Sequence, residues 1–200
     1  MKASHGQDGV VKFTSLMQED KLTSILDIGS GDKQHFNYMF NKLPNTFAND
    51  FDPDCDYIGD FNKIVFERTF DGIHAAHVLE HQPNPHNFLK KIHSILNEGG
   101  WLCITVPPLK HTIVGGHVSL WNAGLVIYHL VLAGFNCKDV KIKAYGYNIS
   151  IIVKKNSIKE DIPLKYVGVD LKTINKYLPP SIKYTGANCS FNGDIKVLNW

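Results

Sequence analysis

Two glycines separated by one serine stand where an apolar segment gives way to a helical pattern. Gly29, Ser30 and Gly31 directly follow the apolar run Ile25–Ile28. Glycines at such a place allow a tight turn and let a ligand approach the bare backbone. About twenty residues later, Asp50 ends a second apolar run, where a carboxylate can accept hydrogen bonds from both ribose hydroxyls. Gly-Ser-Gly alone is equally typical of an ordinary turn, but the full arrangement predicts a nucleoside-binding site.

The same loop disfavours a dinucleotide such as NAD. The G-x-G-x-x-G fingerprint needs glycine or alanine at its sixth position, because the helix must start close to the pyrophosphate. Here that position is Gln34, and Lys33 precedes it. Both side chains would crowd the start of the helix.

A second group of reactive side chains runs from His77 to His81. It matches H-x-x-E-H, a zinc-peptidase pattern in which a helix presents both histidines to the ion and Glu80 acts as base. The run follows an apolar segment, however, and Pro83 and Pro85 leave little room for a long helix. We therefore expect no metal here. For Glu80 and His81, helix capping and packing are as plausible as a role in binding substrate.

Further histidines follow the next apolar segment. Imidazole, with an unperturbed pKa of about 6.5, can accept a proton at neutral pH. His117 is our first candidate for a catalytic proton acceptor, with His81 and His77 next, although His117 could equally cap a helix or hold its loop. His111 and Trp121 are candidate substrate contacts, while a tryptophan at such a place more often packs against a helix.

These residues need a scaffold, and apolar runs of strand length alternate with helical patterns from about residue 24 to residue 153. Helices are predicted over His35–Leu43, Asn87–Leu96 (with Glu98-Gly99-Gly100 as its C-cap) and Leu125–Leu132. Strands are predicted over Ile25–Ile28, Thr46–Phe51, Tyr57–Ile58, Phe70–Val78, Trp101–Val106, Val140–Tyr145 and Ser150–Val153. The pattern predicts an α/β fold with a mostly parallel seven-stranded sheet and an antiparallel hairpin at one edge.

Length and composition are those of one globular domain. The chain has 200 residues, of which 44% are hydrophobic and 20% charged, so it can bury a core without disulfides. We assign residues 1–155 to the main domain and residues 156–200 to a C-terminal extension packed on it. Four separated cysteines without a C-x-x-C pair, no signal peptide and no bilayer-length apolar run predict a soluble, cytoplasmic protein.

The charge pattern disfavours a nucleic-acid partner. The net charge is +2, and Arg68 is the only arginine available for base or phosphate contacts. Residues 138–177 contain nine lysines against four acids, which more often marks a solvated surface than a phosphate-binding patch.

Taken in order, the motifs over about residues 22–153 resemble class I S-adenosylmethionine-dependent methyltransferases. The matching segments are ILDIGSGD, NDFDP, YIGDF, FDGIHAAHVLEH, LNEGGWLCITVPP and GHVSLW followed by LVLAGF. The resemblance implies a Rossmann-like, doubly wound fold and S-adenosyl-L-methionine as the cofactor. Its implied binding residues are Asp27 and Gly29–Gly31 for the methionine part, Asp50 (or, less favoured, Asp52) and Phe51 for the ribose, Asp60 and Phe61 for adenine, and His77 beside the methyl group. Many members have a third glycine where this chain has Lys33.

The resemblance also implies a reaction. Nucleic-acid amine methylation typically uses Asn/Asp-Pro-Pro-Tyr/Phe after the fourth strand, whereas this chain has Ala75-Ala76-His77-Val78. We therefore expect O-methylation of a small molecule, with sugars favoured, by a monomer or a homodimer. RNA methylation and a binding module without turnover remain alternatives. Some ubiquinone-type O-methyltransferases use a similar LEH segment to hold a metal, which is a minority alternative here.

Overall fold

An eight-stranded mixed sheet forms the centre of the computed structural model, which describes residues 6–165, 167–168, 170–182 and 189–200. The first five strands run parallel, and the last three pair antiparallel. In spatial order the strands are β3 (Tyr57–Ile58), β2 (Thr46–Asp50), β1 (Ile25–Ile28), β4 (Phe70–Ala76), β5 (Leu96–Val106), β7 (Asn148–Lys154), β6 (Lys141–Tyr145) and β8 (Val197–Leu198). The predicted α/β class and mostly parallel sheet are confirmed.

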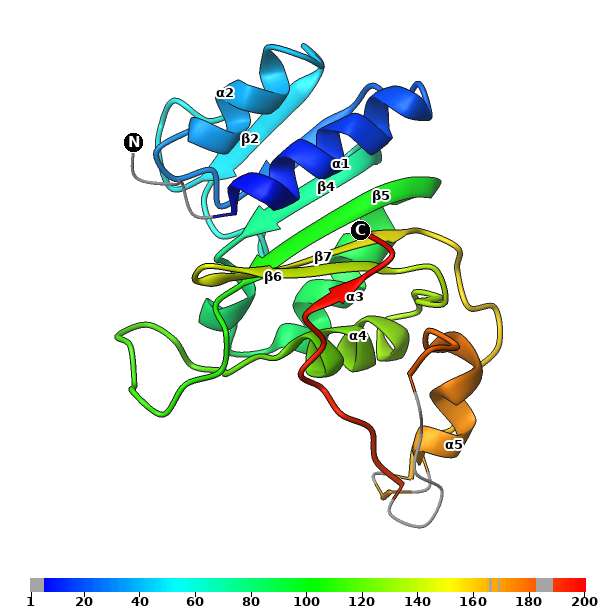
Figure 1. The fold of residues 1–200 in the computed structure, drawn as a ribbon. Helices are drawn as coiled ribbons and strands as arrows, with labels where there is room; N and C mark the ends of the chain where they lie inside the picture. Colours follow the sequence, from blue (N-terminus) through cyan, green and yellow to red (C-terminus); the bar gives the residue numbers. More distant parts are fainter. Residues whose placement is uncertain (1–5, 166, 169, 183–188) are drawn as a thin grey trace.

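Helices cover both faces of the sheet (Figure 1). On one face lie α1 (Gln7–Glu19) and α2 (Gln34–Phe40), and on the other lie α3 (Pro85–Ile95) and α4 (Ala123–Leu132). The prediction did not include α1, although its apolar residues Val10, Phe13 and Met17 recur at helical spacing. Phe13 and Met17 pack so closely on the sheet that a Cβ on Gly72 would lie 2.8 Å from each.

The sheet has eight strands rather than the predicted seven. After the β6–β7 hairpin, the C-terminal chain returns and places β8 beside β6. Because β7 pairs with β5, the hairpin lies one strand inside the edge rather than at it. A two-residue strand is too short to show an alternating pattern, so β8 could not be read from the sequence.

The predicted C-cap of α3 was wrong. The helix ends at Ile95, its cap residue Leu96 is already extended, and Gly99 and Gly100 belong to β5. Gly99 donates its N–H to the carbonyl of Lys155, and Lys155 donates to that of Gly100, at 2.9 and 2.7 Å. A Cβ on Gly100 would lie 2.5 Å from the carbonyl oxygen of Asp71. The glycine pair therefore allows close strand pairing instead of ending a helix.

The C-terminal segment packs on the domain through α5 (Asp170–Ile174), the 3-10 helix η2 (Asn175–Tyr177) and β8. Leu171 and Ile174 are buried in the main core. At the start of α4, Gly124 donates its N–H to the carbonyl of Gly193 at 2.9 Å. The division of the chain at residue 155 stays a prediction. Of the helices in the described ranges, none is long and apolar enough to cross a membrane.

Candidate active site

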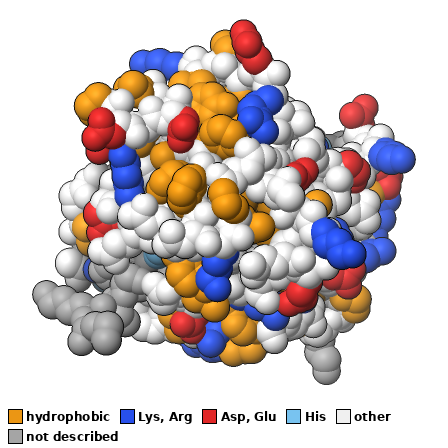
Figure 2. Space-filling model, turned by 90° about the horizontal axis from the view of Figure 1, so that it is seen from above, with side chains coloured by type: hydrophobic (Ala, Val, Ile, Leu, Met, Phe, Trp, Pro, Cys, Tyr) orange, Lys and Arg blue, Asp and Glu red, His pale blue; other side chains and the backbone are white. Residues whose placement is uncertain are grey.

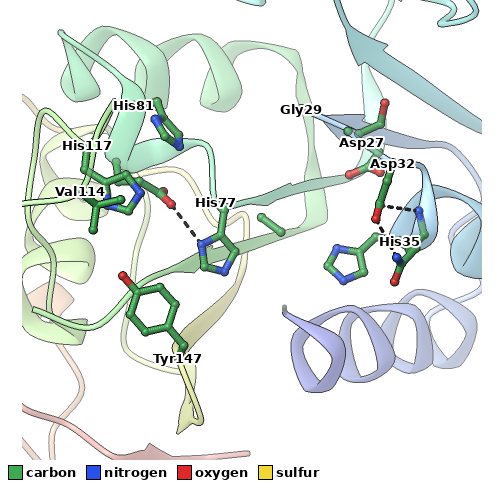
Figure 3. A pocket seen from close by; sticks show the side chains of 14 residues that line it. Asp27, Gly29, Asp32, His35, His77, His81, Val114, His117 and Tyr147 are labelled. Carbon is green, nitrogen blue, oxygen red and sulfur yellow. Dashed lines mark hydrogen bonds and ion pairs between the residues drawn. The ribbon is translucent and has the colours of Figure 1, made fainter. Parts of the chain in front are cut away.

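A cavity of about 770 Å³ opens at the carboxyl ends of β1 and β4 (Figure 3). This is where parallel α/β sheets bind their ligands. The glycine loop lines one end, histidines line the other, and His77 lies between them (Figure 3). The lining residues are Asp27, Gly29, Ser30, Gly31, Asp32, Gln34, His35, Ala76, His77, Glu80, His81, Val114, His117 and Tyr147.

The backbone of the glycine loop is held in a conformation that favours glycine. Gly29 and Gly31 have φ angles of 67° and 49°. The N–H groups of Gly29 and Ser30 both donate to the carbonyl of Asn49 on β2, at 2.8 and 3.2 Å. A Cβ on Gly29 would lie only 2.5 Å from Cγ2 of Val78. A side chain at Gly29 would therefore collide with Val78 and displace the loop.

Asp50 connects the end of β2 to the glycine loop. Its carboxylate accepts the N–H of Gly31 at 2.9 Å and that of Phe51 at 2.6 Å. Asp52 instead accepts the N–H of Asp54 and lies 4.0 Å from Lys33 Nζ, with its side chain 42% exposed. Asp50 thus lies beside the cavity and holds its wall, whereas Asp52 faces solvent. The Phe51 side chain is 75% exposed.

Lys33 has a left-handed backbone conformation, which glycine adopts more readily than other residues. This accounts for the glycine that many similar sequences have at this position. Lys33 is the N-cap of α2, with a φ of 60°. Its ammonium group donates to the carbonyl of Asp54 at 3.1 Å, and Lys33 is not among the residues lining the cavity. Gln34 lines the cavity, so the predicted crowding at Gln34 stays a prediction, whereas Lys33 is directed elsewhere.

A buried hydrogen bond between Asp27 and His74 lies at the glycine-loop end of the cavity. Asp27 is 2% exposed, and its Oδ1 lies 2.7 Å from Nδ1 of His74, which is fully buried on β4. Asp27 Oδ2 has no hydrogen-bond partner among the described residues. An unpaired buried carboxylate oxygen is costly, so this atom suits a cationic ligand group. No local sequence signal identifies His74 as a partner of Asp27, because β4 and β1 meet only in the folded sheet.

The two residues predicted to contact adenine do not line the cavity. Asp60 accepts hydrogen bonds from the backbone and side chain of Asn62. Phe61 is 5% exposed and packs its ring against Phe66 and Phe88, so the ring belongs to the core. Their role toward adenine stays a prediction.

His77 ends β4 in a strained conformation, with a φ of 56°. Its Nδ1 lies 3.1 Å from Glu80 Oε1, and its Nε2 lies 2.9 Å from Asn148 Oδ1. Because both partners are acceptors, both ring nitrogens donate. Burial lowers the pKa of His77, but the hydrogen bonds to Glu80 and Asn148 and the charge of Glu80 raise it, with a net upward shift. A doubly donating His77 is a poor proton acceptor.

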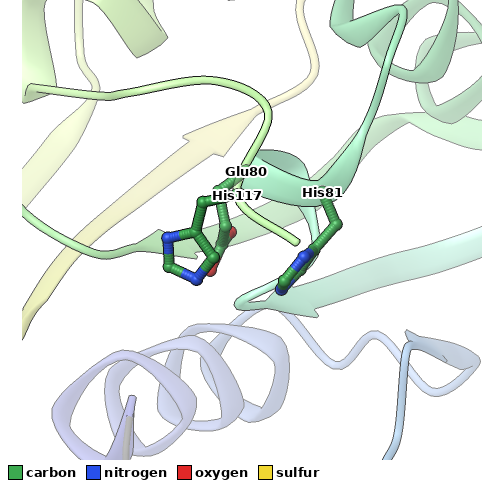
Figure 4. A group of neighbouring side chains, drawn as sticks. All are labelled: Glu80, His81 and His117. Atoms are coloured by element: carbon green, nitrogen blue, oxygen red, sulfur yellow. The ribbon is translucent and has the colours of Figure 1, made fainter. Parts of the chain in front are cut away.

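Glu80, His81 and His117 converge at the far end of the cavity (Figure 4). One ligand atom from each lies within 4.8 Å of the others. Glu80 is fully buried, and its Oε2 has no hydrogen-bond partner in the described structure. The two imidazoles meet edge to face, with ring centroids 5.0 Å apart. We call these three residues the EHH cluster.

The loop between β5 and α4 brings His117 to this cluster. Val118 donates its N–H to the carbonyl of Glu80 at 2.9 Å, which ties the loop to the 3-10 helix η1 (Leu79–His81). The carbonyl of Gly116 lies 2.8 Å from Nδ1 of His81. Gly116 has a φ of 80°, and a Cβ there would lie 3.2 Å from His81 Nδ1. Gly116 therefore fixes the loop against His81.

Two predicted substrate contacts lie away from the cavity. His111 is exposed on the loop after β5 and does not line it. Trp121 is 2% exposed, donates its indole N–H to Ser119 Oγ at 2.8 Å and packs edge-on against His129. Trp121 is a core residue and offers no stacking face to a ligand.

Tyr147 and His35 line the cavity but were missed. Tyr147 lies in the turn between β6 and β7, and its ring is parallel to that of His77 at a centroid distance of 6.4 Å. The sequence analysis predicted only a hairpin around this position. Its position beside His77 depends on the long-range pairing of β7 with β5.

Comparisons with known proteins agree with this architecture. A family model described as a methyltransferase domain matches residues 7–131. Among curated proteins, none matches the chain by sequence.

Solved methyltransferases share the fold at low identity. The N-methyltransferase NodS from Bradyrhizobium japonicum WM9, in complex with S-adenosyl-L-homocysteine, has a TM-score of 0.61 at 15% identity, over 78% of this chain and 90% of that one. The 1,6-didemethyltoxoflavin-N1-methyltransferase from Burkholderia thailandensis, with its acceptor and S-adenosylhomocysteine, has a TM-score of 0.60 at 17% identity, over 74% and 79%. Human N-acetylserotonin methyltransferase, in complex with S-adenosylmethionine, has a TM-score of 0.58 at 16% identity, over 76% and 53%.

This chain spans only about half the length of several of the structures that it matches, including the human enzyme. At such identities the structural matches establish the fold alone. The family model, however, covers more than half of the chain, and it confirms the resemblance carried by the ordered motifs. The chain belongs to the methyltransferase-domain family of class I S-adenosylmethionine-dependent methyltransferases.

Proposed function

We propose that this chain transfers the methyl group of S-adenosylmethionine to a hydroxyl of a small polar molecule, with sugars and sugar-bearing metabolites favoured. One observation carries the proposal. A single cavity joins a glycine loop beside the unpaired Asp27 Oδ2 to a histidine-rich end. One end suits a nucleoside with a cationic amino-acid part, and the other suits an acceptor that must lose a proton.

The residues at the loop end fit the cofactor. Asp27 Oδ2 is buried and unpaired, as an acceptor for the cofactor's ammonium group would be. Gly29 and Gly31 line this end of the cavity with bare backbone, which a methionine part could approach closely. Asp50 is the proposed ribose ligand, and Asp60 the proposed adenine ligand. When bound, the cofactor supplies an electrophilic methyl group, so the chain must orient the acceptor and exclude water.

The lining of the cavity favours a polar acceptor. Of its side chains, Ala76 and Val114 are apolar, and most of the others can donate or accept hydrogen bonds. Histidines at the far end are suited to removing the hydroxyl proton. Both ring nitrogens of His77 are engaged in hydrogen bonds, so the proton acceptor would be His117 or His81. His117 remains the first candidate.

RNA methylation is less well supported. Lysines from the lysine-rich stretch pair with acids, as in Lys143–Asp8, Lys154–Asp20 and Lys176–Glu160. Figure 2 shows basic and acidic side chains interspersed on the face in view, where a strand-binding surface would segregate them. A binding module without turnover was suggested by Lys33, but the ammonium group of Lys33 is directed toward Asp54.

A methyl-transfer assay with radiolabelled S-adenosylmethionine tests the proposal. Hydroxylated sugars, other small hydroxyl or amine compounds, and RNA are offered in parallel to the purified chain. Label in a sugar product supports the proposal, and label in RNA alone would replace it with the RNA alternative. Tight S-adenosylhomocysteine binding without product from any class would support the binding module.

A further inference from the structure

We propose that the EHH cluster binds a divalent transition-metal ion, and that Zn²⁺ is the ion it suits best. We expected no metal from His77 and His81 as a helical ligand pair, and kept a metal held by the LEH segment only as a minority alternative. The structure instead joins Glu80 and His81 to His117 from a separate loop. The role assigned to the ion below rests on the proposed function, whereas its binding does not.

The first observation is the state of the Glu80 carboxylate. The residue is fully buried, and Oε2 has no hydrogen-bond partner in the described part of the chain. Oε1 is held by His77 Nδ1 at 3.1 Å, which fixes the carboxylate plane. Burying a carboxylate oxygen without a donor is costly, and a bound cation removes that cost. Figure 4 shows the carboxylate beside both imidazole rings.

The second observation is the orientation of His81. The carbonyl of Gly116 can only accept, so Nδ1 of His81 carries the proton in their 2.8 Å hydrogen bond. In a neutral imidazole this leaves Nε2 with a free lone pair. Histidines that bind metals almost always donate their other N–H to a carbonyl or carboxylate in this way.

The third observation is the spacing of the cluster. Its three ligand atoms lie within 4.8 Å of one another. Tetrahedral Zn²⁺, with bonds of about 2.0–2.2 Å, places its ligand atoms roughly 3.4 Å apart. Among the described residues, the His117 side chain makes no hydrogen bond, although its ring contacts that of His81. Because no hydrogen bond among the described residues holds its ring, His117 is the ligand that can reorient to close this difference.

The chemistry of the ligands selects the ion. Two imidazoles and one carboxylate suit Zn²⁺ and other first-row transition ions, whereas Mg²⁺ and Ca²⁺ prefer oxygen ligands. Three protein ligands leave one tetrahedral position open. Because all three residues line the cavity, that position faces the acceptor.

At this position the ion would bind the acceptor's hydroxyl oxygen and lower the pKa of that hydroxyl. The proton leaves to solvent, the new O–CH₃ bond forms as the S–CH₃ bond breaks, and S-adenosylhomocysteine is released. His117 would then be a ligand rather than the general base. His77 would be a positioning residue that holds Glu80.

The test uses Co²⁺ as a visible probe and Zn²⁺ as the competing ion. Chelator-treated protein is titrated with Co²⁺, followed by absorption, and with Zn²⁺, followed by calorimetry. We expect one ion per chain, the intense visible bands of four-coordinate Co²⁺, and their loss on adding Zn²⁺. Glu80→Gln and His117→Ala should each weaken binding roughly a hundredfold or more. His86→Ala, on α3 and outside the cluster, is the matched histidine control and should bind like the wild type.

His117→Ala alters a half-buried loop side chain, so it tests the site independently of any folding defect in Glu80→Gln. Wild-type protein that binds neither ion, or a His117→Ala variant that binds as tightly as His86→Ala, would overturn the proposal. Failure of the methyltransferase function is detected separately, as loss of S-adenosylhomocysteine binding or of product. Metal binding together with full turnover in chelated protein would overturn the assigned role and restore His117 as base.

Discussion

Asp50 and Asp52 are close in sequence but differ in their hydrogen-bond partners and in their exposure to solvent. Asp50 accepts the N–H of Gly31 and so joins the end of β2, our proposed ribose position, to the glycine loop, while Asp52 is solvent-exposed beside Lys33. We predict that Asp50→Ala weakens S-adenosylhomocysteine binding more than Asp52→Ala, since hydrogen bonds to a charged group contribute about 1.5–3 kcal/mol. Calorimetry on both variants measures the difference. A larger loss in Asp52→Ala would move the ribose ligand two residues along the chain.

His74 is a positioning residue for Asp27. Its Nδ1 lies 2.7 Å from Asp27 Oδ1 in the core of the sheet. We predict that His74→Phe, which removes the donor, weakens S-adenosylhomocysteine binding roughly tenfold to a hundredfold. His74→Asn, which keeps a side-chain N–H, should restore most of the affinity. Equal affinities in variants of matched thermal stability would show that the hydrogen bond does not matter for binding.

At the scale of elements, the loop between β5 and α4 positions His117 and depends on Gly116. Gly116→Ala places a side chain at a φ of 80° and 3.2 Å from His81 Nδ1. We predict that turnover falls at least about tenfold while S-adenosylhomocysteine affinity is retained, because the cofactor end is untouched. Gly115→Ala is the control, since a Cβ there meets nothing within 4 Å. Similar turnover in both variants would separate the loop from catalysis.

The elements predicted correctly are those with a local signal. β1, β2 and β4 are short apolar runs, and α4 is an apolar run closed by Gly134, so each was found within a few residues. The glycine loop followed from its position after β1. Tyr147, His35 and His74 could not be identified as site residues, because each reaches the cavity or Asp27 only through tertiary packing. Trp121 was misplaced for the same reason, since nothing local shows that its indole is buried.

At the scale of the whole molecule, His93 links α3 to the segment after β7. Its Nε2 lies 3.1 Å from Ser157 Oγ, and its ring packs edge-on against Phe135. Burial, followed by the charges of Lys155 and Lys90, lowers the pKa of His93. The unfolded chain therefore binds a proton more readily, and this group reduces stability as pH falls below about 6.5.

We predict that the free energy of unfolding decreases from about pH 7 to about pH 5.5, and decreases less in His93→Gln. Denaturant titrations of both proteins at the two pH values measure this difference. An equal decrease in both proteins would assign the acid sensitivity to other groups, such as His129, whose pKa is lowered chiefly by burial.

The cavity depends on the whole sheet, because its glycine loop, its buried Asp27 and its histidine end come from different strands. The most direct test of its identity is a calorimetric titration of the purified chain with S-adenosylhomocysteine and, in parallel, with NAD. We predict one molecule of S-adenosylhomocysteine per chain, at least about tenfold weaker binding in Asp27→Asn, and no binding of NAD. Binding of NAD with no response to S-adenosylhomocysteine would contradict the assignment of the cavity as a methyltransferase cofactor site.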